Sequence, residues 1–296
     1  AAVNMVLGAA STGVRAMTSS SSPGVSLKAE GISYMAGSDL PAVIINVQRG
    51  GPGLGSIQPA QSDYYQATHA MGHGDFHILV FAPCSVQEMV DTVMKAFDKA
   101  DEYRIPAMIL ADGLLGQMME PVTFPPARET LPDKSDWAAC GHGNKRPHHI
   151  INSLYLDAPL LEKNVKERFE RYAIIEEHET DAELYQCDDA ELVVTAYGAS
   201  ARVAKSAVMT ARKQGLKVGL FRPKTLWPFP KKELNQAIAH ASQLLCVEMS
   251  MGQMIDDVRL AINCSRPVAF FGRTGGVIPT PAEVLAEIKK LMGGEA

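Results

Sequence analysis

The stretch MTSSSSPGVSL, residues 17–27, joins an apolar segment to the start of a helix through a loop made almost wholly of hydroxyl side chains. Ser22 stands where a helix N-cap belongs and Pro23 stands at the first helical position, so the stretch predicts a helix over residues 24–36. The side chains of this helix that could be buried are Val25, Leu27, Ile32 and Met35. Helix N-termini at the carboxyl ends of strands bind ligands in open α/β folds, although an ordinary serine-rich turn has the same composition.

Strands and helices alternate on both sides of this stretch. We expect a short strand over residues 14–17, and the runs AVIINV (42–47) and AMILAD (107–112) are continuous apolar segments, typical of parallel strands buried on both faces. Ser85 and Glu88 form a capping box that should open a helix reaching about residue 103. The predicted fold class is therefore α/β, with a doubly wound open sheet.

The alternation lapses after residue 122 and resumes at residue 189. Residues 123–188 are rich in proline and in charge, which is typical of an extended crossing segment with one amphipathic helix. A second α/β unit then begins with the strand LVVTAYG at residue 192. We therefore expect two doubly wound domains, residues 1–122 and 189–296, joined by residues 123–188 as a crossing linker.

The first residues have the apolar spacing of a helix that is already under way. Residues 1–13 are preceded by no strand and by no helix-start residue. We therefore expect that the amino terminus is truncated and that the first strand of the sheet is missing.

The composition excludes several classes of protein. The chain has 296 residues, 46% of them hydrophobic, and its net charge of -5 argues against nucleic acid or an anionic membrane as a partner. Its five cysteines are scattered without a CxxC pair, which suits a reducing cytoplasm and predicts neither a disulfide framework nor an iron-sulfur site in this chain. The residues Cys140, His142, His148 and His149 match no zinc spacing, so we interpret them as part of a polar loop and predict no metal site.

A glycine-rich loop follows the AVIINV strand. It lacks the Lys-Ser/Thr pair of a phosphate-binding loop, and Pro52 removes one of the amides that such a loop would use. We interpret the loop as a substrate lid made of Gly50, Gly51, Pro52, Gly53, Leu54 and Gly55. A pyrophosphate-binding Gly-Asp-Gly motif is also absent, because Gly74-Asp75 is followed by Phe76 and Asp112-Gly113 has no fitting partner.

Several motifs together resemble one enzyme family. The segments TSSSSPGVSLKAEGISYMAGSDLP, NVQRGGPGLGSIQP, QSDYYQA, GHGD and ADGLLGQMMEP look like the alpha subunit of the 2-oxoacid:ferredoxin oxidoreductases, of the 2-ketoisovalerate type. The later segments VVTAYGASARVAKSAV, GLFRPKTLWPFP and EMSMGQM fit the same subunit, so the resemblance covers nearly the whole chain. It implies that residues 1–122 are a pyrimidine-binding domain for thiamine diphosphate and that residues 189–296 are similar to the C-terminal domain of transketolase.

The resemblance also implies an activity and its cofactors. The reaction would be the oxidative decarboxylation of a branched-chain 2-oxoacid to its acyl-coenzyme A with reduction of ferredoxin, in a cytoplasmic complex whose isolated alpha subunit is inactive. Thiamine diphosphate would be shared with a beta subunit, and Mg²⁺ and iron-sulfur clusters would lie on other subunits. The complex would also contain a gamma subunit, a ferredoxin-like delta subunit and contacts between two copies of this chain. The family's catalytic glutamate is expected upstream of Ala1. The residues implied to bind the cofactor are Thr18, Ser19, Ser20, Ser21, Ser22, Pro23 and Gly24.

Arg49 is the candidate catalytic residue. It follows the AVIINV strand at the carboxyl edge, where such sheets bind ligands, and the glycines after it let the backbone approach closely. A 2-oxoacid carries a carboxylate, which a guanidinium group can bind through two parallel hydrogen bonds. The position and the resemblance together favour this role over that of a surface arginine.

Three other functions stay open. The chain could be the alpha subunit of a 2-oxoglutarate:ferredoxin oxidoreductase, the thiamine-binding beta chain of a lipoamide-dependent oxoacid dehydrogenase, or a non-catalytic assembly module. The serine loop and the RGGPGLG segment argue against the lipoamide-dependent enzyme. The QPAQSDY segment favours a branched aliphatic oxoacid over 2-oxoglutarate by family likeness alone.

Overall fold

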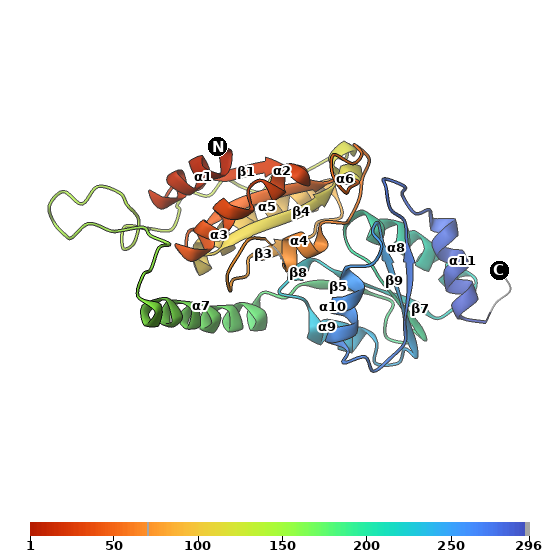
Figure 1. The fold of residues 1–296 in the computed structure, drawn as a ribbon. Helices are drawn as coiled ribbons and strands as arrows, with labels where there is room; N and C mark the ends of the chain where they lie inside the picture. The colour runs from red at the N-terminus through yellow and green to blue at the C-terminus, as the bar shows by residue number, and fades with distance from the viewer. Residues whose placement is uncertain (70, 294–296) are drawn as a thin grey trace.

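Two five-stranded sheets organise the chain (Figure 1). The computed structural model describes residues 1–69 and 71–293. The first sheet has the strand order β1-β2-β4-β3-β8 and the second has the order β10-β9-β6-β7-β5. The expected fold class, α/β with two open sheets, is confirmed.

The first sheet is parallel except at one edge. Its strands are β1 (Met17–Ser20), β2 (Ala42–Gln48), β3 (Leu79–Phe81), β4 (Pro106–Asp112) and β8 (Thr225–Trp227), of which β8 pairs antiparallel with β3. The helices of this part of the chain are α1 (Ala2–Ser11), α2 (Pro23–Ser26), α3 (Ala29–Gly37), α4 (Tyr64–Thr68), α5 (Val86–Tyr103) and α6 (Gly113–Gln117). The continuous apolar runs of β2 and β4 lie at the centre of this sheet, as their sequences predict.

The second sheet is built in the same way. Its strands are β5 (Ala182–Tyr185), β6 (Leu192–Thr195), β7 (Val218–Pro223), β9 (Gln243–Glu248) and β10 (Val268–Gly272), of which β5 pairs antiparallel with β7. The remaining helices are α7 (Ala158–His178), α8 (Gly198–Lys213), α9 (Lys231–Ala237), α10 (Met254–Ala261) and α11 (Pro281–Leu291). Within the described residues, no helix combines the length and the apolar character that crossing a bilayer requires.

Each sheet ends in one antiparallel strand from outside its own predicted domain. Strand β5 comes from the expected crossing segment but joins the second sheet, and β8 comes from the second unit but joins the first. Residues 118–157 form neither helix nor strand, and α7 is the one helix between residues 123 and 188. Strand β8 therefore links the two units directly, while β5 joins the crossing segment to the second sheet.

The serine-rich stretch differs from its prediction. The strand expected at residues 14–17 is β1, three residues later, because hydroxyl side chains suit a half-exposed edge strand that pairs only with β2. The helix expected at 24–36 is divided into α2 and α3, and Leu27 at the break is 87% exposed rather than buried. At the break, the buried Lys28 turns back so that its Nζ donates a 2.9 Å hydrogen bond to the carbonyl of Ser19.

The capping box at the start of α5 is only half formed. The amide of Glu88 donates to Ser85 Oγ at 3.1 Å, as the sequence predicts. The Glu88 carboxylate instead accepts two hydrogen bonds from Arg222 on β7, at 2.8 and 3.0 Å, and one from the Cys84 amide. An ion pair between Glu88 and Arg222 therefore replaces the second half of the capping box.

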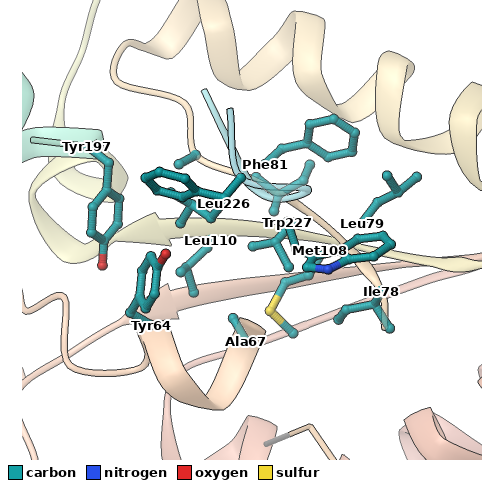
Figure 2. Close-up of a cluster of buried hydrophobic side chains, with 14 of the residues drawn as sticks. Tyr64, Ala67, Ile78, Leu79, Phe81, Met108, Leu110, Tyr197, Leu226 and Trp227 are labelled. Carbon is teal, nitrogen blue, oxygen red and sulfur yellow. The ribbon is translucent and has the colours of Figure 1, made fainter. Parts of the chain in front are cut away.

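A shared apolar core lies between the sheets. Figure 2 shows Tyr64 and Tyr197 beside each other, near Trp227 and Phe81, and the ring centroids of the two tyrosines are 5.8 Å apart. The buried cluster contains side chains of β3, β4, α4 and β8 together with Tyr197, which precedes α8. The two sheets are therefore packed against each other through a shared cluster of buried apolar side chains.

Candidate active site

The carboxyl edge of the first sheet holds a cavity. In the strand register, Ser20 lies opposite Asn46 and Gln48 lies opposite Asp112, so the segments after β1, β2 and β4 start side by side. The cavity beside these segments has a volume of about 260 Å³. The residues that line it are Ser21, Val47, Gln48, Arg49, Ile57, Gly113, Gly116 and Gln117. Two of the predicted site residues, Ser21 and Arg49, therefore face one cavity.

The Arg49 side chain has no partner among the residues that the structure describes. Its Nε is buried and makes no hydrogen bond, and its guanidinium group takes part in none of the ion pairs of residues 1–69 and 71–293. A buried donor without an acceptor is costly, which makes this group a candidate for binding an anion. A guanidinium group offers a planar pair of donors that matches a carboxylate.

Ser22 fixes the backbone of Arg49. The Arg49 amide donates to Ser22 Oγ at 3.0 Å, and Ser22 Oγ donates to the Asp63 carboxylate at 2.5 Å. The Ser22 amide donates to Asn46 Oδ1 at 2.9 Å. These bonds hold Ser22 at φ 34°, in the left-handed region that non-glycine residues seldom adopt.

Three polar residues of this network, Asn46, Gln48 and Asp63, were not among the sites predicted from the sequence. Asn46 Nδ2 donates to Asp63 Oδ2 at 2.9 Å, and the Asp63 amide donates to Gln48 Oε1 at 3.1 Å. Asn46 and Gln48 are fully buried. The signal was present in the sequence, since a polar side chain within an apolar strand must find a hydrogen-bonding partner in the fold.

The predicted cofactor-binding residues do not form one loop. Thr18, Ser19 and Ser20 belong to strand β1, and Pro23 and Gly24 belong to helix α2. Ser22 occupies the N-cap position, but its side chain does not cap the helix because the hydroxyl is bound to Asp63 and to the Arg49 amide. Of these residues, Ser21 lines the cavity and Ser22 positions the backbone of Arg49.

The glycine-rich loop folds back on itself beside the cavity. The Gly50 amide donates to the Gln58 carbonyl at 2.9 Å, and Arg49 pairs with Pro59 in an isolated antiparallel bridge. We call residues 50–58, which include the predicted lid residues, the lid loop. Its two large apolar side chains are exposed, Leu54 by 87% and Ile57 by 80%, and Ile57 lines the cavity.

The rest of the cavity wall is small or apolar. Val47 and Ile57 supply branched apolar side chains, while Gly113 and Gly116 supply none. A Cβ atom at Gly116 would lie 3.4 Å from Val47 Cγ1, so the glycine leaves the wall open at this point. Among the lining residues, Arg49 is the one that carries a formal charge.

Asp112 lies next to the cavity but is engaged within the chain. Its carboxylate accepts hydrogen bonds from the amides of Leu114 and Leu115 at 3.0 Å each, and from the Ala199 amide at 3.1 Å. Burial raises the pKa of this carboxyl, while the three amide bonds oppose the rise. Asp112 therefore caps α6 and links it to α8.

Comparisons with known proteins agree with this architecture. Residues 1–187 match the family model described as pyruvate flavodoxin/ferredoxin oxidoreductase, thiamine diphosphate-binding, and residues 190–284 match that of pyruvate:ferredoxin oxidoreductase core domain II. The ketoisovalerate oxidoreductase subunit VorB of Methanothermobacter marburgensis is 49% identical over 294 residues, which cover 99% of this chain and 83% of that protein. The 2-oxoglutarate synthase subunit KorA of the same organism is 35% identical over 321 residues, covering 99% and 84%.

Two solved structures share the fold. The 2-oxoglutarate:ferredoxin oxidoreductase of Magnetococcus marinus superposes with a TM-score of 0.83 at 23% identity, over 97% of this chain and 55% of that one. A split gene transketolase superposes with a TM-score of 0.58 at 14% identity, over 100% and 83%. The resemblance to 2-oxoacid:ferredoxin oxidoreductase alpha subunits is confirmed, and the chain belongs to the pyruvate flavodoxin/ferredoxin oxidoreductase family.

Proposed function

We propose that this chain is the alpha subunit of a 2-oxoacid:ferredoxin oxidoreductase that oxidatively decarboxylates a branched-chain 2-oxoacid to its acyl-coenzyme A. The unpartnered guanidinium group of Arg49 at the cavity is the observation that carries the proposal. A 2-oxoacid presents a carboxylate to such a group, and bidentate binding would fix the reacting carbonyl relative to the sheet edge. The 49% identity to a ketoisovalerate oxidoreductase subunit supports the same reaction.

The remaining cavity wall favours an aliphatic side chain on the substrate. Val47 and Ile57 offer apolar contact area, and the glycines at 113 and 116 leave room for a branched group. The second carboxylate of 2-oxoglutarate would need a second cation, and the described lining offers only Arg49. The wall therefore supports a branched-chain substrate over the 2-oxoglutarate alternative.

Thiamine diphosphate is the cofactor that the matched family model names. When bound, it supplies the nucleophilic carbon and the electron sink that decarboxylation of a 2-oxoacid requires. Ser21 and Gln117 offer polar side chains to it in the cavity, beside the half-exposed edge formed by Thr18, Ser19 and Ser20. Pro23 and Gly24 continue this edge, so residues 18–24 as a whole remain our proposed cofactor contact.

Other subunits would supply the rest of the machinery. The carboxylate of Asp112 is engaged by three amides, so we assign the Mg²⁺ ion and the diphosphate contacts to a beta subunit. The iron-sulfur clusters would lie on that subunit and on a ferredoxin-like delta subunit. The further partners would be a gamma subunit, coenzyme A, ferredoxin and a second copy of this chain. The five free cysteines support a cytoplasmic location.

The same proposal includes the domain division. Residues 1–122 would form the pyrimidine-binding domain, residues 123–188 the crossing linker and residues 189–296 the second domain. The two sheets support this division, with β5 of the linker completing the second sheet and β8 of the second domain completing the first.

Ferredoxin reduction by the reconstituted complex tests the proposal. Turnover is expected with 3-methyl-2-oxobutanoate and coenzyme A, and to be much slower with 2-oxoglutarate. Reduction of lipoamide instead of ferredoxin would establish the lipoamide-dependent alternative. A complex that is equally active without this chain would identify the chain as an assembly module.

A further inference from the structure

The segment after β10 packs directly against the lid loop. We call residues 273–277, at the carboxyl end of the second sheet, the clamp loop. Figure 1 shows this segment, in blue, beside the orange loop that lies near α6. The contact joins two domains at the place where the proposed substrate lid leaves the first sheet.

The two loops approach each other at glycine positions, where the backbone of the clamp loop lies against the Gln58 side chain. A Cβ atom at Gly276 would lie 2.3 Å from Gln58 Cβ, closer than real Cβ atoms approach, and 3.2 Å from Gln58 Cγ. On the other side, a Cβ at Gly50 would lie 3.3 Å from the carbonyl carbon of Gly275 and 3.4 Å from the Gly276 nitrogen. The clamp loop therefore leaves room for no side chain at Gly276, and Gly50 faces its backbone closely.

The clamp loop itself is anchored within the second domain. The Arg273 amide donates to the Glu248 carbonyl at 3.1 Å, and its guanidinium group pairs with Glu283 at the start of α11. The Val277 amide closes a turn by donating to the Thr274 carbonyl at 3.3 Å. The lid loop thus rests against a surface that is fixed to β9 and α11.

The exit of the lid loop is anchored to the same domain. Gln61 is fully buried and makes five hydrogen bonds across the domain interface, with Tyr197, Ser200 and Met249. Its amide donates to the Met249 carbonyl at 2.8 Å, and its Oε1 accepts from Ser200 Oγ at 2.6 Å. Both the contact at the base of the loop and the segment that follows the loop therefore depend on the second domain.

We infer that the second domain positions the lid loop over the cavity, with Gly276 against Gln58 as the contact that sets its position. Residues 51–55 are exposed, and few internal hydrogen bonds hold the loop, such as that from the Ser56 amide to the Gly50 carbonyl. Such a loop would open readily without external support. The inference rests on the proposed function in so far as the loop covers substrate, whereas the contact itself can be tested separately.

Hydrogen exchange on the purified full chain tests the contact. Gly276→Ala should increase the exchange rate of the Gly50 and Ser56 amides about tenfold or more, since the added methyl group forces the loops apart. Gly275→Ala is the matched control. Its φ is also positive, at 68° against 99° for Gly276, but its Cβ would meet nothing within 4 Å. The control should leave exchange of the lid loop unchanged.

A second substitution at Gln58 separates this contact from backbone strain. In Gly276→Ala, the further change Gln58→Gly removes the opposing Cβ and leaves Gln58 Cα as the nearest atom, at 3.5 Å. This pair should restore slow exchange, while Gln58→Ala in the same background keeps the Cβ and should not. Equal exchange in Gly276→Ala and the parent chain, or rescue by both substitutions, would overturn the inference.

Activity of the reconstituted complex tests what the contact is for. Gly276→Ala should lower kcat/KM for the 2-oxoacid about tenfold, mainly through KM, and Gln58→Gly should recover it in parallel with the exchange rate. Faster exchange with unchanged kcat/KM would confirm the contact and contradict a role of the loop as a substrate lid. The failure of the inference and that of the proposed function are thereby distinguished.

Discussion

The backbone amide of Arg49 donates a 3.0 Å hydrogen bond to the hydroxyl of Ser22, which lies 27 residues earlier in the chain. The same hydroxyl donates to Asp63, so the serine-rich stretch and the arginine belong to one network. Ser22 therefore acts on the proposed substrate site through Arg49. This relationship makes it a positioning residue in our proposal.

The first prediction concerns the guanidinium group of Arg49. Arg49→Lys keeps the charge but loses the planar pair of donors, and should weaken catalysis by about 1.4 to 3 kcal/mol, or roughly tenfold to a hundredfold in kcat/KM. Arg49→Ala should lower kcat/KM further than Arg49→Lys does. Affinity for thiamine diphosphate should hardly change, because its diphosphate is assigned to another subunit. Steady-state ferredoxin reduction and a cofactor titration measure the two effects, and an Arg49→Ala complex with parental kcat and KM would exclude the role.

The second prediction separates the hydroxyl of Ser22 from its backbone strain. Ser22→Ala and Ser22→Gly both leave the Arg49 amide without its acceptor, so both should lower kcat/KM about tenfold. Glycine tolerates the φ of 34°, so Ser22→Gly should be the more stable of the two. Thermal unfolding and kinetics on both variants measure this. If activity followed stability rather than the loss of the hydroxyl, the positioning role would be wrong.

The third prediction concerns substrate choice. Ile57→Arg adds a second cation to the cavity wall, which should shift the ratio of kcat/KM for 2-oxoglutarate over 3-methyl-2-oxobutanoate about tenfold or more towards the dicarboxylate. Leu54→Arg is the matched control, since this side chain is equally exposed on the same loop but does not line the cavity. The control should leave the ratio unchanged. A similar shift in both variants would indicate a general electrostatic effect instead.

The fourth prediction concerns cofactor binding by the isolated chain. Because Asp112 is engaged by three amides, this chain should bind thiamine diphosphate weakly in the presence of Mg²⁺, and addition of the partner beta subunit should restore tight binding. Calorimetry on the two preparations measures the difference. Submicromolar binding by this chain alone would contradict our assignment of the diphosphate site to another subunit.

The fifth prediction concerns stability in acid. Burial alone would raise the pKa of Glu88 and of Glu183. Hydrogen bonds outweigh it, from Arg222 to Glu88 and from Lys205 and Arg222 to Glu183, and they lower both pKa values below the ordinary 4.5. Both carboxylates thus stabilise the fold above pH 4.5, and this contribution is lost as the pH falls through their lower folded pKa values. Arg222→Ala should lower the free energy of unfolding at pH 7 by about 3 kcal/mol.

The acid dependence and a control complete that test. In Arg222→Ala, the free energy of unfolding should fall less steeply below pH 4.5 than in the parent chain, since the two pKa values return towards 4.5. Lys217→Ala removes an exposed ion pair with Glu191 and should leave the unfolding free energy nearly unchanged. Urea unfolding across pH 3–7 measures both. An unchanged acid slope in Arg222→Ala would contradict the linkage.

Local patterns were reliable where one interaction dominates. The runs of β2 and β4 predicted buried parallel strands because a strand covered on both faces carries mostly apolar residues on both. The position of Arg49 after β2 followed from the same pattern. The polar residues Asn46 and Gln48 went unnoticed, because only the folded sheet edge brings their partner Asp63 to them.

Local patterns failed where a distant group competed for the same atoms. Ser22 was predicted to cap a helix, but its hydroxyl is hydrogen-bonded to Asp63 and to the Arg49 amide. The Glu88 side chain was predicted to complete a capping box, but it pairs with Arg222 instead. A charge-assisted or buried hydrogen bond is worth more than an exposed local cap, and its partner cannot be identified from sequence spacing.

The sequence by itself determined the α/β alternation, the central strands, the family and the identity of Arg49 as a candidate, because these depend on apolar periodicity and on motifs that are contiguous in the chain. Only the tertiary structure decided that β5 of the linker joins the second sheet, that β8 joins the first sheet and that Gly276 meets Gln58. Contacts of this kind join residues far apart in the chain, and their geometry is set by how two domains pack.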